Sequence, residues 1–192
     1  MIKESADGKV KINDLYKYNR YFELRNQLIL KCNELGQNEN RVFEEKFTDF
    51  YLKINNKTND FLLDIGIITP ESISGSAFLL EQRRGVEKVL SSIWCADGKH
   101  WSDRILRDTS DLQNRLEKGI VDSITRGLSK DELVKQLMYD FQVEFHKADR
   151  IARTELTHVQ NQSCSDRYVA CGIEQYKILA ELDNRTSEEC KE

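Results

Sequence analysis

The sequence contains a single proline, Pro70, and only nine glycines in 192 residues. Antiparallel sandwiches and barrels need turn residues at about every tenth position, and this composition does not supply them. An all-β fold is therefore excluded. Apolar residues are also sparse, at 39% of the chain, with a mean hydropathy of −0.62. This apolar fraction is enough for a folded core, and it suits elongated helices better than a globular domain with a large core.

Long hydrophobic runs and an excess of positive charge are both lacking. Apolar stretches such as Ala77–Leu80 are far shorter than a membrane span, and no apolar run follows the first charges of the chain. We therefore expect no membrane association and a protein that stays inside the cell. The 29 Lys and Arg against 33 Asp and Glu give a net charge of −4. This charge balance argues against an extended basic surface that binds nucleic acid, so any DNA contact should be local.

Residues that carry chemistry are few and scattered. The five cysteines include no CxxC pair, so neither a disulfide framework nor a zinc knuckle is predicted. We expect four of them to be reduced packing residues: Cys32, Cys95, Cys164 and Cys171. His146 and His158 are too far apart for one helical turn, and no phosphate loop or nucleophile elbow is present. The sequence predicts neither an enzyme nor a bound cofactor.

Two apolar stripes dominate residues 1–70, which we predict to be a first domain. Both repeat at steps of three and four, and their members are Leu15, Tyr18, Phe22, Arg25, Ile29 and Cys32, then Phe43, Phe47, Phe50, Ile54, Lys57 and Phe61. Gly36 and the polar run 37–40 separate the stripes, which predicts an extended antiparallel helical hairpin. Such a narrow seam either completes the core of this chain or forms an arm for a larger assembly.

Residues 71–192 predict a second, mainly helical unit with a short β element at its end. Helices are expected over 76–94, 112–124, 130–141 and 144–169, with Gly127 and Gly172 as stops. The best local signal is a capping box of Ser129 and Glu132, with Leu128 and Leu133 as a hydrophobic staple. Alternating residues 176–182 predict a strand. The predicted fold class is therefore mainly α, with a small α+β carboxyl-terminal part.

The charged run Arg150–Glu155 lies on a helix that must also bury an apolar face. A buried charge requires a partner, and a second charged cluster follows the predicted strand. One interpretation pairs Arg153 with Asp183 and Glu155 with Arg185. The other is an ordinary solvated helix face.

Several of these residues resemble a known family. The run Ala148–Glu155, followed by Asn161, Gly172, Tyr176, the run 183–186 and Cys190, is similar to the core signature of the phage Mu F-like minor head proteins, also called head morphogenesis proteins. The likeness continues upstream through Trp101–Ile105 and is dense from Trp94 onward. It implies structural roles for the matching motif residues: Arg153, Thr154, Glu155, Asn161, Gly172, Asp183, Arg185, Thr186 and Cys190.

The resemblance also implies a function, a location and a set of partners. It implies a minor capsid protein of a tailed phage or prophage, inside the capsid near the portal and in the host cytoplasm during assembly. The portal protein, the scaffold, the major capsid protein and packaged DNA are the implied partners. It further implies a part in head assembly and in DNA packaging or ejection.

Two departures from the family pattern concern metal binding. Relatives often carry a cysteine three residues before Cys190, where this chain has Ser187. Relatives also continue beyond the position of Glu192, so we expect a chain truncated at its carboxyl end. Cys190 is the one candidate metal ligand, and it would hold zinc only if residues after Glu192 completed the site.

Alternative functions use other residues. A DNA-binding module would use Arg83, Arg84, Lys147 and Arg150, and it predicts affinity that falls steeply with salt. A nuclease or transferase would use Glu155 and His158. A third alternative is the amino-terminal carrier part of a phage-associated toxin enzyme.

Overall fold

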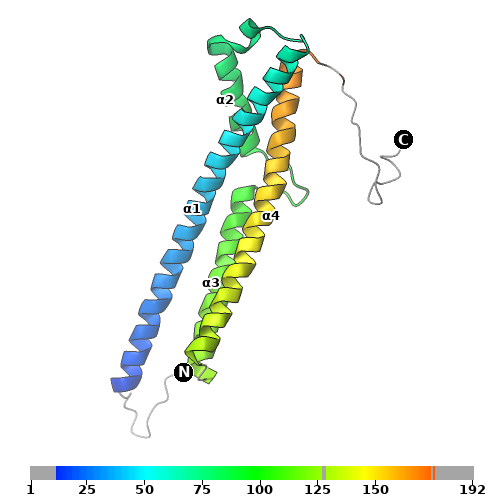
Figure 1. Cartoon of the computed structure of the whole chain (residues 1–192). Coiled ribbons are helices and arrows are strands. Elements are labelled where there is room, and N and C mark those ends of the chain that lie inside the picture. Colours follow the sequence, from blue (N-terminus) through cyan, green and yellow to red (C-terminus); the bar gives the residue numbers. More distant parts are fainter. Residues whose placement is uncertain (1–11, 127–128, 174, 176–192) are drawn as a thin grey trace, which may run out of the picture.

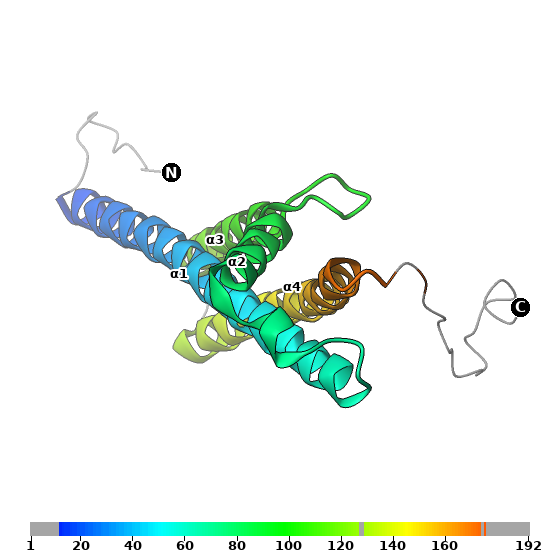
Figure 2. The ribbon, with the colours of Figure 1, turned by 90° about the horizontal axis from the view of Figure 1, so that it is seen from above.

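The structure is a computed structural model that describes residues 12–126, 129–173 and 175. Its elements are α1 (Ile12–Asp64), the short 3-10 helix η1 (Pro70–Ile73), α2 (Gly75–Ser91), α3 (Trp101–Arg126) and α4 (Lys130–Ala170). The long helices α1, α3 and α4 pack against one another, and α2 packs on one end of α1 and α4 (Figures 1 and 2). The predicted mainly α fold is confirmed. No strand occurs in the described residues, and the predicted strand over 176–182 lies outside them.

The predicted helical hairpin is wrong, because α1 is one continuous helix of 53 residues. At 1.5 Å per residue it is about 80 Å long. Gly36, expected to end a helix, is buried where α1 crosses α3, and a Cβ atom there would lie 2.9 Å from Oγ1 of Thr109. Residues 37–40 are polar, but no proline interrupts them, so the helix continues. The glycine permits close helix packing and does not form a turn.

The buried face of α1 also differs from the predicted second stripe. Phe47 is buried as expected, but Phe61 is 53% exposed and Lys57 is exposed. The buried positions on this part of α1 are Phe47, Tyr51, Asn55, Thr58, Asn59 and Leu62. They include the adjacent pair Thr58 and Asn59 and so depart from the strict three-four repeat. The face is wider because this part of α1 contacts both α2 and α4.

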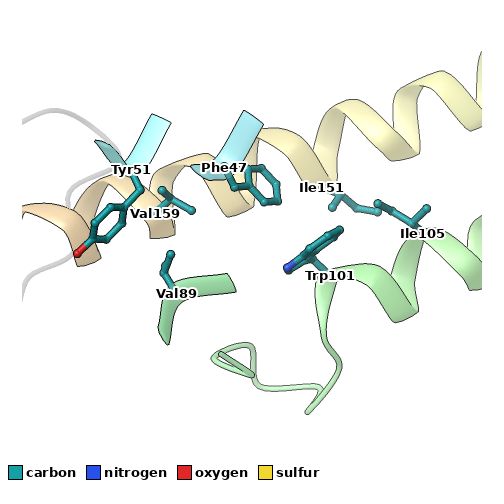
Figure 3. Close-up of a cluster of buried hydrophobic side chains, with 7 residues drawn as sticks. All are labelled: Phe47, Tyr51, Val89, Trp101, Ile105, Ile151 and Val159. Carbon is teal, nitrogen blue, oxygen red and sulfur yellow. The ribbon is translucent and has the colours of Figure 1, made fainter. Parts of the chain in front are cut away.

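The main core combines side chains from four helices (Figure 3). Its buried members are Phe47, Tyr51, Val89, Trp101, Ile105, Ile151 and Val159. The rings of Phe47 and Trp101 meet edge to face, with centroids 5.5 Å apart. Burying each large apolar side chain contributes about 1.5–3 kcal/mol. A second cluster of Cys32, Leu112 and Leu116 joins α1 to α3 nearer the amino terminus of α1.

The predictions for the other helices succeed in part. α2 matches the predicted helix over 76–94 closely, but α3 begins at Trp101, eleven residues before Leu112. The capping box of Ser129 and Glu132 is present at the start of α4. Leu128 of the predicted staple lies outside the described residues. α4 continues through 141–144, where two helices were expected, and Gly172 follows its end with φ of 73°. No described helix combines the length and the apolar character that crossing a membrane requires.

The cysteines of the described part carry free thiols. Cys32 is buried against Leu112 and Leu116, whereas Cys95, Cys164 and Cys171 are half-buried. Burial raises the pKa of the Cys32 thiol, and the carboxylates of Glu144 and Glu117 add to the effect. A thiol with a raised pKa is a poor nucleophile, so Cys32 is a packing residue.

Candidate functional site

The candidate site is the middle of α4, which carries the charged run singled out in the sequence. Glu155 is 4% exposed, whereas Arg153, Thr154 and Asn161 are exposed. Within this run, then, the carboxylate is the group that the fold takes out of water. Asp183, Arg185, Thr186 and Cys190 lie outside the described residues, so the predicted pairs Arg153–Asp183 and Glu155–Arg185 stay predictions.

Both oxygens of the Glu155 carboxylate have donors from other segments. Nη1 of Arg104 in α3 donates to Oε1 at 3.2 Å, and Nε1 of Trp94 donates to Oε2 at 2.9 Å. Arg104 also bonds Asp97 in the loop between α2 and α3, at 2.6 Å. A buried carboxylate is stable only when its lone pairs are satisfied in this way. Glu155 therefore joins α4 to α3 and to the preceding loop.

His158, one helical turn after Glu155, completes this contact. Its ring stacks on Trp94 with centroids 4.4 Å apart and planes at 11°, and its Nε2 lies 3.1 Å from Oγ of Ser92. Burial lowers the pKa of His158, although the nearby Glu155 carboxylate opposes that shift. The histidine is therefore neutral near pH 7 and acts as a flat stacking surface for the loop.

The exposed residues of the run have local roles. Arg153 pairs with Asp149 one turn earlier on α4, and both side chains are accessible. Sequence reasoning missed Trp94, Asp97 and Arg104 as partners of the motif. The Trp94 indole and the Arg104 guanidinium were visible as donors, but they are 61 and 51 residues from Glu155 in sequence. No local spacing could assign them to it.

A second polar layer lies between α1, α3 and α4. Arg115 lies 3.3 Å from both Asp140 and Glu144, and Lys147 lies 3.5 Å from Asp108. Glu39 of α1 faces this layer, and burial, with the nearby charges of Glu144 and Asp108, raises its pKa to about 7. The layer has more carboxylates than cations, which makes it sensitive to protonation.

The structure also bears on the alternative sites. Arg83 pairs with Glu87, and Lys147 pairs with Asp108 and Asp111. Arg84 and Lys88 of α2 line the same cavity as Asp166, which is roughly 24 Å along α4 from Arg150 at 1.5 Å per residue. These cations are therefore partly neutralised and do not gather in one patch.

An open cavity of about 390 Å³ lies between α1, α2 and α4. Its lining includes Tyr51, Arg84, Lys88 and Asp166, but neither Glu155 nor His158. The hydroxyl of Tyr51 donates to Asp166 at 2.9 Å, and Lys88 bonds the same carboxylate at 3.0 Å. Glu155 and His158 are thus engaged in internal contacts away from this cavity. In the described part of the chain, no group of His, Cys, Asp and Glu is arranged to hold a metal ion.

Comparison with known proteins finds a family likeness in the carboxyl-terminal part of the chain. Residues 114–192 match the family model of the Phage Mu protein F like proteins. The match takes in the second half of α3, all of α4 and the motif residues from Arg153 to Cys190, so the predicted resemblance is confirmed there. The upstream likeness at 101–105 lies outside the match. No curated protein and no solved structure matches the chain.

Proposed function

We propose that this protein, phage Mu F-like over residues 114–192, is a minor capsid protein that takes part in head morphogenesis of a tailed phage or prophage. The family match is the observation that carries the proposal. It implies a place in the virion, and we assign the chain to the capsid interior next to the portal vertex. There it aids head assembly and the packaging or ejection of DNA.

The geometry of the motif supports a structural role. Glu155, the buried charge among the motif residues that the structure describes, accepts hydrogen bonds on both oxygens from groups within the chain, and His158 stacks on Trp94. Catalysis would need at least one of these groups to face a substrate. Instead the contacts hold the loop between α2 and α3 against α4, which gives the long bundle a fixed shape. A rigid, elongated scaffold suits a protein that joins other virion components.

The amino-terminal end of α1 is the part of the bundle that we assign to the portal or scaffold. Leu24 and Leu30 are 45% and 61% exposed there, and α1 extends about 80 Å in all. This assignment keeps the predicted arm function but gives it to one helix. Deletion of residues 15–61, which were predicted to form the arm, would remove Phe47 and Tyr51 from the core, so substitutions are the better probe.

The test is co-sedimentation of the purified chain with portal oligomers encoded by the same phage or prophage. We expect the chain to sediment with the portal, and Leu24→Ser with Leu30→Ser to weaken binding. The matched control is Ile65→Ser with Ile67→Ser, two residues about half exposed beyond the other end of α1. Equal binding by both double variants would move the contact away from the arm. A chain that never sediments with portal, scaffold or capsid protein would contradict the proposal.

The DNA-binding alternative has a separate readout. Because the chain is acidic overall and its basic residues are dispersed, we expect weak DNA binding. Tight binding that falls steeply with salt and is lost on neutralising Arg84 and Arg150 would favour that alternative.

A further inference from the structure

The amino-terminal half of α4 exposes a continuous apolar stripe. Val134, Met138, Phe141 and Phe145 are 43%, 67%, 52% and 69% exposed. Their steps of four, three and four place them on one side of the helix, which is the spacing of a coiled-coil seam. Isolated apolar residues on a surface are ordinary, but a contiguous stripe with two phenylalanines usually marks an interface.

The path of α1 explains why the stripe is uncovered. α1 lies against the carboxyl-terminal half of α4, where Oγ of Ser163 donates to the Tyr51 carbonyl and Thr58 contacts Cys164. Nearer its amino terminus α1 runs alongside α3 (Figure 1). Cys32 of α1 packs there on Leu112 of α3, and the side of α4 that carries Leu137 also packs against this cluster. The stripe therefore lies on a stretch of α4 whose outer face receives no such cover from α1.

We propose that this stripe binds a second copy of the chain, so that two α4 helices pack antiparallel around a twofold axis. The four side chains expose roughly 400 Å² per chain, judged from the usual areas of buried aromatic and aliphatic residues. Two copies would bury about 800 Å² of apolar surface, which is below the area of stable specific interfaces and within the range of weak, transient ones. The association is therefore weak and depends on concentration.

Charge complementarity selects the antiparallel register. When Phe141 faces Phe145 of the second copy, Met138 and Val134 face the small, half-buried residues Ala148 and Ala152. In this register Lys135 lies near Asp149 of the second copy, a carboxylate that also pairs with Arg153 of its own chain. Twofold symmetry makes the contact between copies twice. A parallel pair would leave Lys135 and Asp149 about 21 Å apart along the helix axis.

The experiment measures the oligomeric state of the full chain by sedimentation velocity, in reductant, over a wide range of concentration. We expect a reversible monomer–dimer equilibrium, and Phe141→Glu should weaken it by about tenfold or more because it places a charge at the interface centre. The matched control is Tyr139→Ser, which removes an aromatic residue 63% exposed on another face of the same helix. Far-UV circular dichroism checks that each variant retains its helices.

Charge reversal tests the register itself. Lys135→Glu should weaken the dimer, and the double variant Lys135→Glu, Asp149→Lys should restore part of it, because the pair between copies is re-formed with opposite polarity. Restoration is partial because the new lysine repels Arg153 of its own chain. A chain that stays monomeric at every concentration would overturn the proposal. So would a dimer that Phe141→Glu leaves intact, or loss of portal binding by Phe141→Glu in a chain that never self-associates. The proposal does not depend on the phage function, so portal binding and dimerisation can fail separately.

Discussion

Gly85 of α2 lies directly against the ring of Tyr51 in α1. A Cβ atom added at position 85 would be 1.9 Å from the Tyr51 hydroxyl oxygen and 2.7 Å from its Cζ. Both residues are buried, and the same hydroxyl donates to Asp166 of α4. The glycine therefore sets how closely α1, α2 and α4 approach one another.

Gly85→Ala should lower the free energy of unfolding by about 1–3 kcal/mol, since the added methyl group displaces the tyrosine. This loss exceeds the gain of about 1 kcal/mol that alanine brings to a helix interior. Urea denaturation followed by circular dichroism measures the change. Tyr51→Phe should recover part of the loss in the double variant, because it removes the closest atom. A stabilised Gly85→Ala protein would show that the two helices are not in contact there.

The ion pair of Arg104 with Glu155 gives a second prediction. Arg104→Met leaves the buried Glu155 carboxylate with Trp94 alone, so we expect a loss of about 3 kcal/mol. The matched control is Arg153→Gln, which breaks an exposed pair with Asp149 and should cost less than about 1 kcal/mol. Thermal or urea unfolding distinguishes them. Equal losses for the two variants would mean that Glu155 is not held by Arg104.

The raised pKa of Glu39 predicts that the free energy of unfolding falls as the pH rises. Its pKa is raised from 4.5 to about 7 by burial and by Glu144 and Asp108, so the folded chain binds this proton more tightly than the unfolded chain. Stability from this group is therefore present at acid pH and declines between pH 4.5 and about 7. Glu39→Gln should stabilise the protein more at pH 8 than at pH 5, measured by thermal midpoints. A benefit that is the same at both pH values would show that Glu39 is solvated.

The lowered pKa of His158 predicts the opposite dependence, in which the free energy of unfolding falls as the pH falls. Burial lowers its pKa, so below its ordinary value of 6.5 the unfolded chain takes up the proton first and the folded state loses stability. His158→Gln should flatten the decline in stability between pH 7 and pH 5. It should also cost some stability at every pH, because the stacking on Trp94 is lost. A decline that is unchanged in this variant would assign it to other groups.

Local signals in the sequence predicted local structure well. The capping box at Ser129, the start of α2 and the stop at Gly172 all depend on nearby residues, and all three are present. The predicted end of α2 at Trp94 is wrong, because the helix ends at Ser91 and Trp94 lies in the following loop. The prediction that Gly36 ends a helix was wrong for a physical reason. A glycine ends a helix when it adopts positive φ, but it also permits close packing between helices, and sequence alone does not tell these uses apart. The contact with Thr109 of α3 determines which one applies.

Of the candidate site, the sequence pointed to the charged run of α4 that contains Glu155 but not to the donors that bind Glu155. The motif run placed Glu155 on a helix that must bury one face, but it left open whether the charges of the run are buried or solvated. The structure buries Glu155. Its donors come from Arg104 and Trp94, in segments that reach α4 only through the packing of α2 and α3. Their choice depends on the tertiary fold, which no spacing within the sequence encodes.

The most direct test of the structural role is quantitative mass spectrometry of purified heads from the phage or induced prophage that encodes the chain. The account predicts that the protein is present in every preparation, in few copies relative to the major capsid protein, and stays with heads after their DNA is released and digested. Absence from purified heads, with the protein found free in the lysate, would contradict it.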